Sequence, residues 1–213
     1  AGTNFRFLTA YLSILKGKEF VLTGSKRIQE RPIKELVESL QILGAEISYL
    51  NKKHKAPLKI YGKDLIGDKI RIKGNISSQF ISALLLIAPT LKNGLEINID
   101  GEIVSESYIN MTLMLMSQFG INYERIKNTI KIKRQNYLSK EFYIESDWSA
   151  ASYWYAIVSI NNKIDRLKIK GLRKNSFQGD RVLVKMMISF GVDTEFFEDG
   201  IIIKKNHNLK TFQ

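Results

Sequence analysis

Apolar residues recur along this chain with two periods, and the two follow each other in the same order three times. Spacings of three or four residues, typical of one helix face, occur in residues 36–43, 109–116 and 183–190. After each stretch come two short runs rich in apolar residues with a turn between them, which predicts a strand hairpin. The three helical stripes consist of Leu36, Val37, Leu40 and Leu43; Ile109, Leu113 and Met116; and Leu183, Met187 and Phe190.

Glycines mark equivalent points of the three stretches. Predicted strands end at Gly24, Gly101 and Gly171, spaced 77 and 70 residues apart, and predicted helices end at Gly44, Gly120 and Gly191, spaced 76 and 71 apart. The two series agree to within one residue, which predicts a repeated unit of about 70 residues. Glycine just after a helix favours a left-handed cap. Asp199-Gly200 and Lys127-Asn128 are expected hairpin turns.

The repeat divides the chain into three units of alternating helix and strand. The first covers about 1–62 and lacks its opening strand, whereas those at 63–137 and 138–205 contain every element. The least regular junction is at 137–145, where we expect a domain boundary. The pattern therefore predicts an α/β (α+β) fold.

Composition narrows the possible chemistry. The chain has no Cys and only two His, at positions 54 and 207, so it offers no disulfide, no Cys nucleophile and no convincing metal cluster. The longest apolar run, 83–89, is too short to cross a bilayer, and we expect a cytoplasmic protein. The net charge of +12 favours anionic partners. Alternatively the charge only solvates strand faces, as residues 69–73 suggest with their alternation of Lys or Arg with Ile.

The first helix of each unit begins with small or hydroxyl-bearing residues. These starts read AGTNFRF at 1–7, GNISSQF at 74–80 and ESDWSAASY at 145–153. A helix start exposes backbone N–H groups that bind anions, and small residues permit a close approach. Ser77, Ser78 and Gln79 would add side-chain donors. The alternative is that all three starts are ordinary N-caps, which favour the same residue types.

The loops after the strand-end glycines are a second candidate site. Residues 24–32 are basic, and Arg31 stands next to Pro32 at a helix start. Its guanidinium suits a carboxylate or phosphate, although a weak surface pair with Glu30 or Glu35 is the alternative. The equivalent loop at 103–108 offers hydroxyl groups. No nucleotide-binding glycine motif, zinc-protease motif or hydrolase elbow occurs in the sequence.

Six segments give the chain a specific resemblance. It resembles the 5-enolpyruvylshikimate-3-phosphate synthases (3-phosphoshikimate 1-carboxyvinyltransferases) over essentially its whole length. The segments follow the family's order and read AGTNFRFLTA, LTGSKRIQERPI, GNISSQFISALLLIAP, IVSESYI, ESDWSAASYW and NSFQGD.

The resemblance implies a fold and a division of the chain. Family members have two domains of three βαβαββ units each, an inside-out α/β barrel. Residues 1–145 would be most of one domain, with two units of which the first is truncated. Residues 146–213 would be the first unit of the second domain.

The resemblance also implies an activity: transfer of the enolpyruvyl group of phosphoenolpyruvate to the 5-hydroxyl of shikimate 3-phosphate, with release of phosphate. It implies no metal or organic cofactor, no membrane or nucleic-acid partner, and a monomer. Asp147 would lie at the interdomain hinge, facing the site. Shikimate 3-phosphate would be bound by Ser77, Ser78, Gln79, Ser105 and Tyr108, and phosphoenolpyruvate by Gly2 and Arg31 with Thr3 and Arg6 adjacent.

The family's acid–base groups correspond to positions beyond Gln213, so the resemblance implies no catalytic residue in this chain, which we expect to be inert alone. Trp148 stands where many members have a smaller residue. The alternative function is a basic module that binds nucleic acid or processes RNA phosphates, built from the same unit. It requires clustered Lys and Arg with aromatic platforms. Aromatic residues here, such as Phe5, Phe80 and Tyr155, instead fit apolar helical patterns.

Overall fold

The computed structural model describes residues 2–206. The chain forms two compact units, residues 1–140 and 141–213. The division follows Lys140, which lies within the junction at 137–145 where we expect a domain boundary. Each unit has a hydrophobic core of its own.

Unit 1 begins with a repeat that has three strands. These strands form an antiparallel sheet in the order β1-β3-β2, and helices α1 and α3 pack against it. Its elements are α1 (Gly2–Ser13), β1 (Glu19–Leu22), α2 (Lys26–Glu30), α3 (Lys34–Ile42), β2 (Glu46–Tyr49) and β3 (Leu58–Tyr61).

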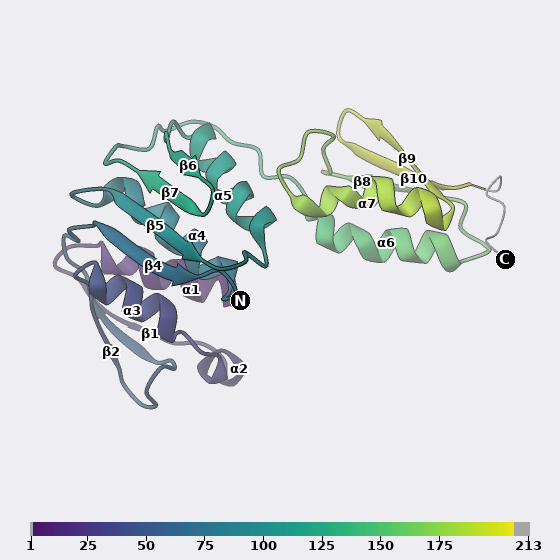
Figure 1. Cartoon of the computed structure of the whole chain (residues 1–213). Helices are drawn as coiled ribbons and strands as arrows, with labels where there is room; N and C mark the ends of the chain where they lie inside the picture. The colour runs from purple at the N-terminus through teal and green to yellow at the C-terminus, as the bar shows by residue number, and fades with distance from the viewer. Residues whose placement is uncertain (1, 207–213) are drawn as a thin grey trace. The chain divides into compact units, whose positions relative to one another are not determined.

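The second repeat of unit 1 is a complete βαβαββ unit (Figure 1). Its sheet has the order β4-β5-β7-β6, in which β4 and β5 are parallel and the other pairs antiparallel. The crossover between the parallel strands is helix α4, as parallel pairing requires. The elements are β4 (Lys69–Lys73), α4 (Ser78–Ile87), η1 (Ala88–Thr90), β5 (Leu95–Asp100), α5 (Glu106–Gln118), β6 (Glu124–Ile126) and β7 (Thr129–Ile132).

One continuous core joins the two repeats of unit 1. Helix α4 lies at its centre, with eight of its ten residues buried, and it packs against α1, α3 and α5. The predicted stripes of α3 and α5 are confirmed, because all seven of their residues are at most 3% exposed. Left-handed caps at Gly44, Gly120 and Gly191 are confirmed by φ angles of 100°, 82° and 73°.

Unit 2 contains one antiparallel sheet of order β8-β10-β9. The predicted turn at Asp199-Gly200 is confirmed, since it joins β9 to β10. The elements are α6 (Trp148–Ile160), β8 (Arg166–Lys170), η2 (Gly179–Val182), α7 (Leu183–Met186), η3 (Met187–Phe190), β9 (Val192–Phe197) and β10 (Gly200–Lys205).

Two predictions for unit 2 were wrong. No strand opens the repeat within residues 138–147, although Ser146 N donates to Gly171 O, next to the end of β8, at 2.8 Å. This segment has a run, 142–144, of exposed apolar residues instead of the alternation of a half-buried strand. The second helix is one α-helical turn between two 3-10 segments, and Phe190 is 64% exposed instead of buried.

No helix in the described range 2–206 is both long enough and apolar enough to span a membrane.

Candidate functional site

The starts of helices α1 and α4 meet, and Gln79 joins them. This residue is the second of α4, and its Nε2 donates a hydrogen bond to Oγ1 of Thr3, at 2.9 Å. Its Oε1 accepts a bond from Nη1 of Arg6, at 3.0 Å. Gln79, which we expect to bind shikimate 3-phosphate, therefore contacts Thr3 and Arg6, which we expect next to phosphoenolpyruvate.

Two arginines converge on Gly2 at the same place. A Cβ on Gly2 would lie 2.4 Å from Nη1 of Arg31 and 2.6 Å from Nη1 of Arg6. Arg6 is only 4% exposed, and its guanidinium lies 5.2 Å from the ring centroid of Phe80. Burial, and then the nearby charge of Arg31, lower the pKa of Arg6. Crowding of two like charges favours a bound anion between them.

The surroundings of these arginines offer them no counter-ion. Among the described residues no ion pair links either guanidinium to a carboxylate, so the pair of Arg31 with Glu30 or Glu35 is not observed. The Nε of Arg6 is buried and has no hydrogen-bond partner. An anion with several oxygen atoms would supply the acceptors that these donors lack.

The first turn of α4 has backbone N–H groups that no N-cap side chain bonds, so they are available to an anion. Ser77 is its N-cap residue, but its side chain makes no capping hydrogen bond. Ser78 is 8% exposed and follows directly. Backbone N–H groups at an uncapped helix start, together with the positive end of the helix dipole, attract anions.

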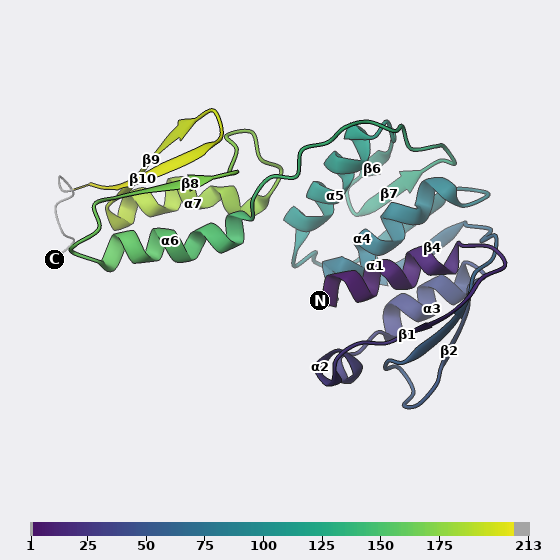
Figure 2. The same cartoon turned by 180° about the vertical axis from the view of Figure 1, so that it is seen from behind.

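The other predicted hydroxyl groups lie at the same edge of the sheet. Because β4 and β5 are parallel, their carboxyl ends adjoin, and Val104 N donates to Gly74 O at 3.3 Å. Ser105 is the N-cap of α5, and Tyr108, 49% exposed, lies in its first turn. Figures 1 and 2 show the starts of α1, α4 and α5 along one side of unit 1.

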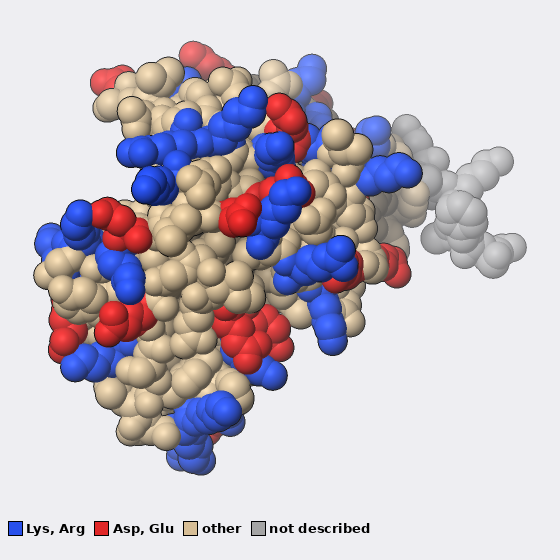
Figure 3. All heavy atoms as spheres, turned by 60° about the vertical axis from the view of Figure 1, so that its left-hand side comes forward, with Lys and Arg blue, Asp and Glu red and all other residues tan. Residues whose placement is uncertain are grey.

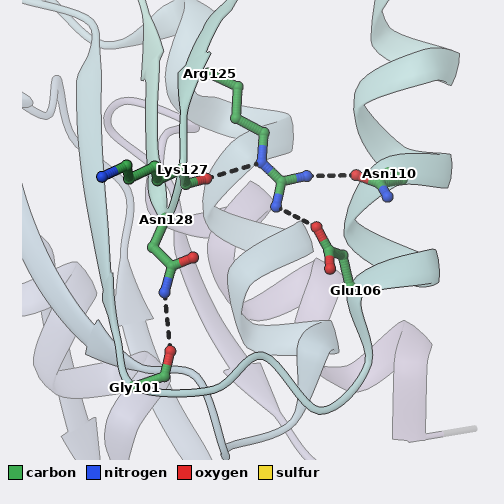
Figure 4. A network of polar contacts seen from close by, with 6 residues as sticks. All are labelled: Gly101, Glu106, Asn110, Arg125, Lys127 and Asn128. Atoms are coloured by element: carbon green, nitrogen blue, oxygen red, sulfur yellow. Dashed lines mark hydrogen bonds and ion pairs between the residues drawn. The ribbon is translucent and has the colours of Figure 1, made fainter.

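A network that the sequence reasoning missed anchors the start of α5 (Figure 4). Arg125, on β6, donates from Nη2 to Oε1 of Glu106 at 2.6 Å, from Nη1 to Oδ1 of Asn110, and from Nε to the carbonyl of Lys127 at 3.3 Å. Next to it, Nδ2 of Asn128 donates to the carbonyl of Gly101 at 2.8 Å. The hairpin thus holds the loop and helix turn that carry Ser105 and Tyr108. No local pattern signals these contacts.

At the third helix start, in unit 2, nearby side chains accept hydrogen bonds from the backbone N–H groups. Asp147 caps α6 by accepting from Ser149 N at 2.7 Å. The amide of Gln178 accepts from Trp148 N at 2.8 Å and donates to Ser146 O at 2.9 Å. Trp148 itself is fully buried in the core of this unit. The hinge role of Asp147 stays a prediction.

On one face of the molecule, charged side chains of both signs lie next to one another. Figure 3 shows Lys and Arg interspersed with Asp and Glu on the face that it presents. Glu96, for example, lies between Lys69 at 3.3 Å and Lys131 at 3.9 Å. Such a face lacks the continuous basic stripe that nucleic-acid binding requires. Within residues 2–206, no three His, Asp or Glu side chains are placed to hold a metal ion.

Known proteins resemble this chain in fold. EPSP synthase from Acinetobacter baumannii superimposes with a TM-score of 0.71 at 20% identity, over 96% of this chain and 47% of that one. A second structure of EPSP synthase from the same organism gives a TM-score of 0.72 over 46% of its length. At this identity the likeness shows the fold alone, and it confirms the predicted α/β enolpyruvyl transferase fold.

Sequence comparison goes further. A protein of Bacteroides fragilis named 3-phosphoshikimate 1-carboxyvinyltransferase is 48% identical over 207 residues, which are 97% of this chain and 50% of that protein. One of Buchnera aphidicola with the same name is 46% identical over 98% of this chain and 48% of its own length. The chain thus spans about half the length of these relatives. Because the family model for EPSP synthase (3-phosphoshikimate 1-carboxyvinyltransferase) matches residues 1–213 throughout, the chain belongs to that family.

Proposed function

We propose that this chain supplies substrate-binding groups for enolpyruvyl transfer from phosphoenolpyruvate to the 5-hydroxyl of shikimate 3-phosphate, in the route to aromatic amino acids. The observation that carries the proposal is the contact of Gln79 with Thr3 and Arg6, which unites two helix starts and two arginines at one place. Both substrates carry a phosphate and a carboxylate, and anions of this kind suit clustered guanidinium and N–H donors.

The residues divide between the two substrates. Shikimate 3-phosphate would be bound from α4 and α5 by Ser77, Ser78, Gln79, Ser105 and Tyr108. Phosphoenolpyruvate would lie over Gly2, with Arg31 and Arg6 neutralising its charge and Thr3 beside it. Gln79 stands at the border of the two groups, so it is suited to hold the substrates next to each other.

The reaction is an addition followed by an elimination. The 5-hydroxyl gives up its proton as its oxygen bonds to C2 of phosphoenolpyruvate, and C3 gains a proton to become a methyl group. Loss of a proton from this methyl group and breakage of the bond from C2 to the phosphate oxygen then restore the double bond and release phosphate. We assign binding and charge neutralisation to this chain, and we expect the groups that transfer protons in another part of a longer protein.

The remaining assignments follow the same proposal. Residues 1–145 belong to one domain and 146–213 begin the second, with Asp147 at the hinge between them. The enzyme works as a monomer in the cytoplasm and needs no organic cofactor. Net charge of +12 raises the local concentration of its two anionic substrates.

Calorimetric titration of the chain with shikimate 3-phosphate tests the site. We expect saturable binding that Gln79→Ala weakens about tenfold, or about 1.4 kcal/mol. The matched control is Gln118→Ala, an exposed residue at the end of α5, which should bind as the wild type does. Equal affinity of wild type and Gln79→Ala would contradict the site, and salt-dependent binding of an RNA oligonucleotide alone would favour the nucleic-acid alternative.

A further inference from the structure

The segment that carries Arg31 lies between helices α2 and α3. Arg31 is the C-cap residue of α2, and its N–H donates to the carbonyl of Ile28 at 3.2 Å. Pro32 has no N–H to donate, and Ile33 is the N-cap residue of α3, with a side chain that is only 1% exposed. The direction of the Arg31 side chain therefore depends on how residues 31–33 are held.

The loop between β2 and β3, residues 50–57, bonds to this segment. The carbonyl of His54 accepts a hydrogen bond from Ile33 N at 3.1 Å. His54 has a φ of 69°, in the left-handed region that residues other than glycine adopt only uncommonly. Such a backbone conformation costs free energy and persists where the surroundings impose it, often at functional sites.

The ring of His54 is held by Tyr49, the last residue of β2. The two rings meet edge-on, with centroids 5.5 Å apart and an interplanar angle of 75°. Tyr49 also packs against the core of unit 1. Burial, followed by the charges of Glu38 and Glu35 on α3, raises the pKa of the Tyr49 hydroxyl to about 12. An uncharged tyrosine ring therefore ties His54 to the core.

The other two repeats have a contact of the same kind. In each, the carbonyl of a hairpin-turn residue accepts a hydrogen bond from a residue at or just after the end of the repeat's preceding strand. Ile99 N donates to Asn128 O at 2.9 Å, and Gly171 N donates to Asp199 O at 2.8 Å. In the first repeat the hairpin loop is longer, and His54 reaches past the strand end to the start of α3. There the hairpin holds the segment that carries Arg31.

We propose that His54 is a positioning residue for Arg31. Its left-handed backbone directs its carbonyl to the N–H of Ile33, and the segment held in this way directs the guanidinium of Arg31 towards Gly2. His54 acts through Arg31 and touches neither substrate. The inference rests on the proposed binding of phosphoenolpyruvate by Arg31, and it adds the residue that holds this arginine in place.

Two substitutions at position 54 separate the backbone conformation from the imidazole. His54→Gly and His54→Val both remove the ring, but glycine adopts the left-handed conformation freely and β-branched valine does not. Without any ligand, His54→Val should speed amide hydrogen exchange at Ile33 several-fold and shift the ¹H–¹⁵Nε NMR signal of Arg31. His54→Gly should stay close to the wild type in both readouts.

Lys127→Val is the matched control. Lys127 has a φ of 53° in the turn between β6 and β7, so valine strains a hairpin turn of the other repeat in unit 1. This variant should lose stability in urea unfolding as His54→Val does, and it should leave Ile33 exchange and the Arg31 signal unchanged.

Calorimetry with both substrates gives the functional readout. Phosphoenolpyruvate is titrated into the chain saturated with shikimate 3-phosphate. His54→Val should bind phosphoenolpyruvate about tenfold more weakly and shikimate 3-phosphate as the wild type does, whereas His54→Gly should bind both normally. A role in stability alone would weaken the binding of both ligands together.

Unchanged Ile33 exchange with an unmoved Arg31 signal in His54→Val would overturn the inference. Equal effects of His54→Gly and His54→Val would also overturn it, because the imidazole would then act instead of the backbone, as would an equal loss of affinity for both substrates. Failure of the wild-type chain to bind phosphoenolpyruvate would contradict the proposed function only, since the two ligand-free readouts still decide whether His54 positions Arg31.

Discussion

At the scale of single residues, Gly2 leaves room for two guanidinium groups. Any side chain on Gly2 would displace Nη1 of Arg31 and Nη1 of Arg6. The neighbouring atoms are ends of flexible side chains, so a methyl group would move them and leave the backbone in place. A substitution at Gly2 should therefore lower the affinity for a ligand without a large change in the free energy of unfolding.

For Gly2→Ala we expect affinity for phosphoenolpyruvate to fall about tenfold or more, because the arginines no longer converge. The free energy of unfolding should change by less than about 1 kcal/mol, because the higher helix propensity of alanine offsets the cost of moving the two arginines. Calorimetry and urea unfolding measure the two effects. The control is Gly17→Ala, a position where an added Cβ meets nothing within 4 Å but where the φ of 74° strains alanine. It should lower stability and leave affinity alone, and the reverse pattern would refute the assignment.

At the scale of elements, the start of α5 is held by a hairpin from later in the chain. Arg125 bonds to Glu106 and Asn110 on the helix and to the carbonyl of Lys127 on its own hairpin. Glu106 is 53% exposed, so solvent screens this pair and its share of stability is small. Its main effect is to order the turn that bears Ser105 and Tyr108.

Arg125→Ala should speed amide hydrogen exchange in residues 105–110 several-fold, because the turn loses its anchor. Global stability should fall by only about 1 kcal/mol. Exchange followed by mass spectrometry measures the first effect and urea unfolding the second. Arg166→Ala, at an exposed position of β8, is the matched control. Unchanged exchange at 105–110 in Arg125→Ala would show that the hairpin does not order this turn.

At the scale of the whole molecule, each unit has a separate core. The core of unit 1 extends through both of its repeats, whereas that of unit 2 contains eight buried apolar residues within the described residues 141–206, with Trp148 and Tyr155 the largest. A small core makes each of its side chains a large part of the stability. The two units should therefore respond differently to the loss of one residue.

Trp148→Ala should unfold unit 2 and leave unit 1 folded, because removal of a buried tryptophan costs about 3–5 kcal/mol. Amide NMR signals of residues 141–206 should collapse to random-coil shifts, and those of residues 2–140 should persist. Trp154→Ala, which removes the half-exposed tryptophan, should leave both sets in place. Loss of all signals together would show that the units fold as one.

Much of this protein follows from local pattern. Helix stripes in unit 1, left-handed caps at Gly44, Gly120 and Gly191, and the hairpin turn at Asp199-Gly200 depend on residues close in sequence. Such features follow from periodicity and backbone sterics. The chemically distinctive helix starts were identifiable for the same reason.

Tertiary packing decided the rest. Gln79 contacts Arg6 and Thr3 across 73 and 76 residues of sequence, and Arg125 reaches Glu106 across 19, so no local period encodes either contact. In unit 2 the pattern also predicted a strand before α6 and a regular second helix, and both were wrong. There the apolar residues at 142–144 and at Phe190 stay at least 40% exposed, so the contacts that they make do not bury them. Periodicity states which side chains can be buried, but only packing against another element buries them.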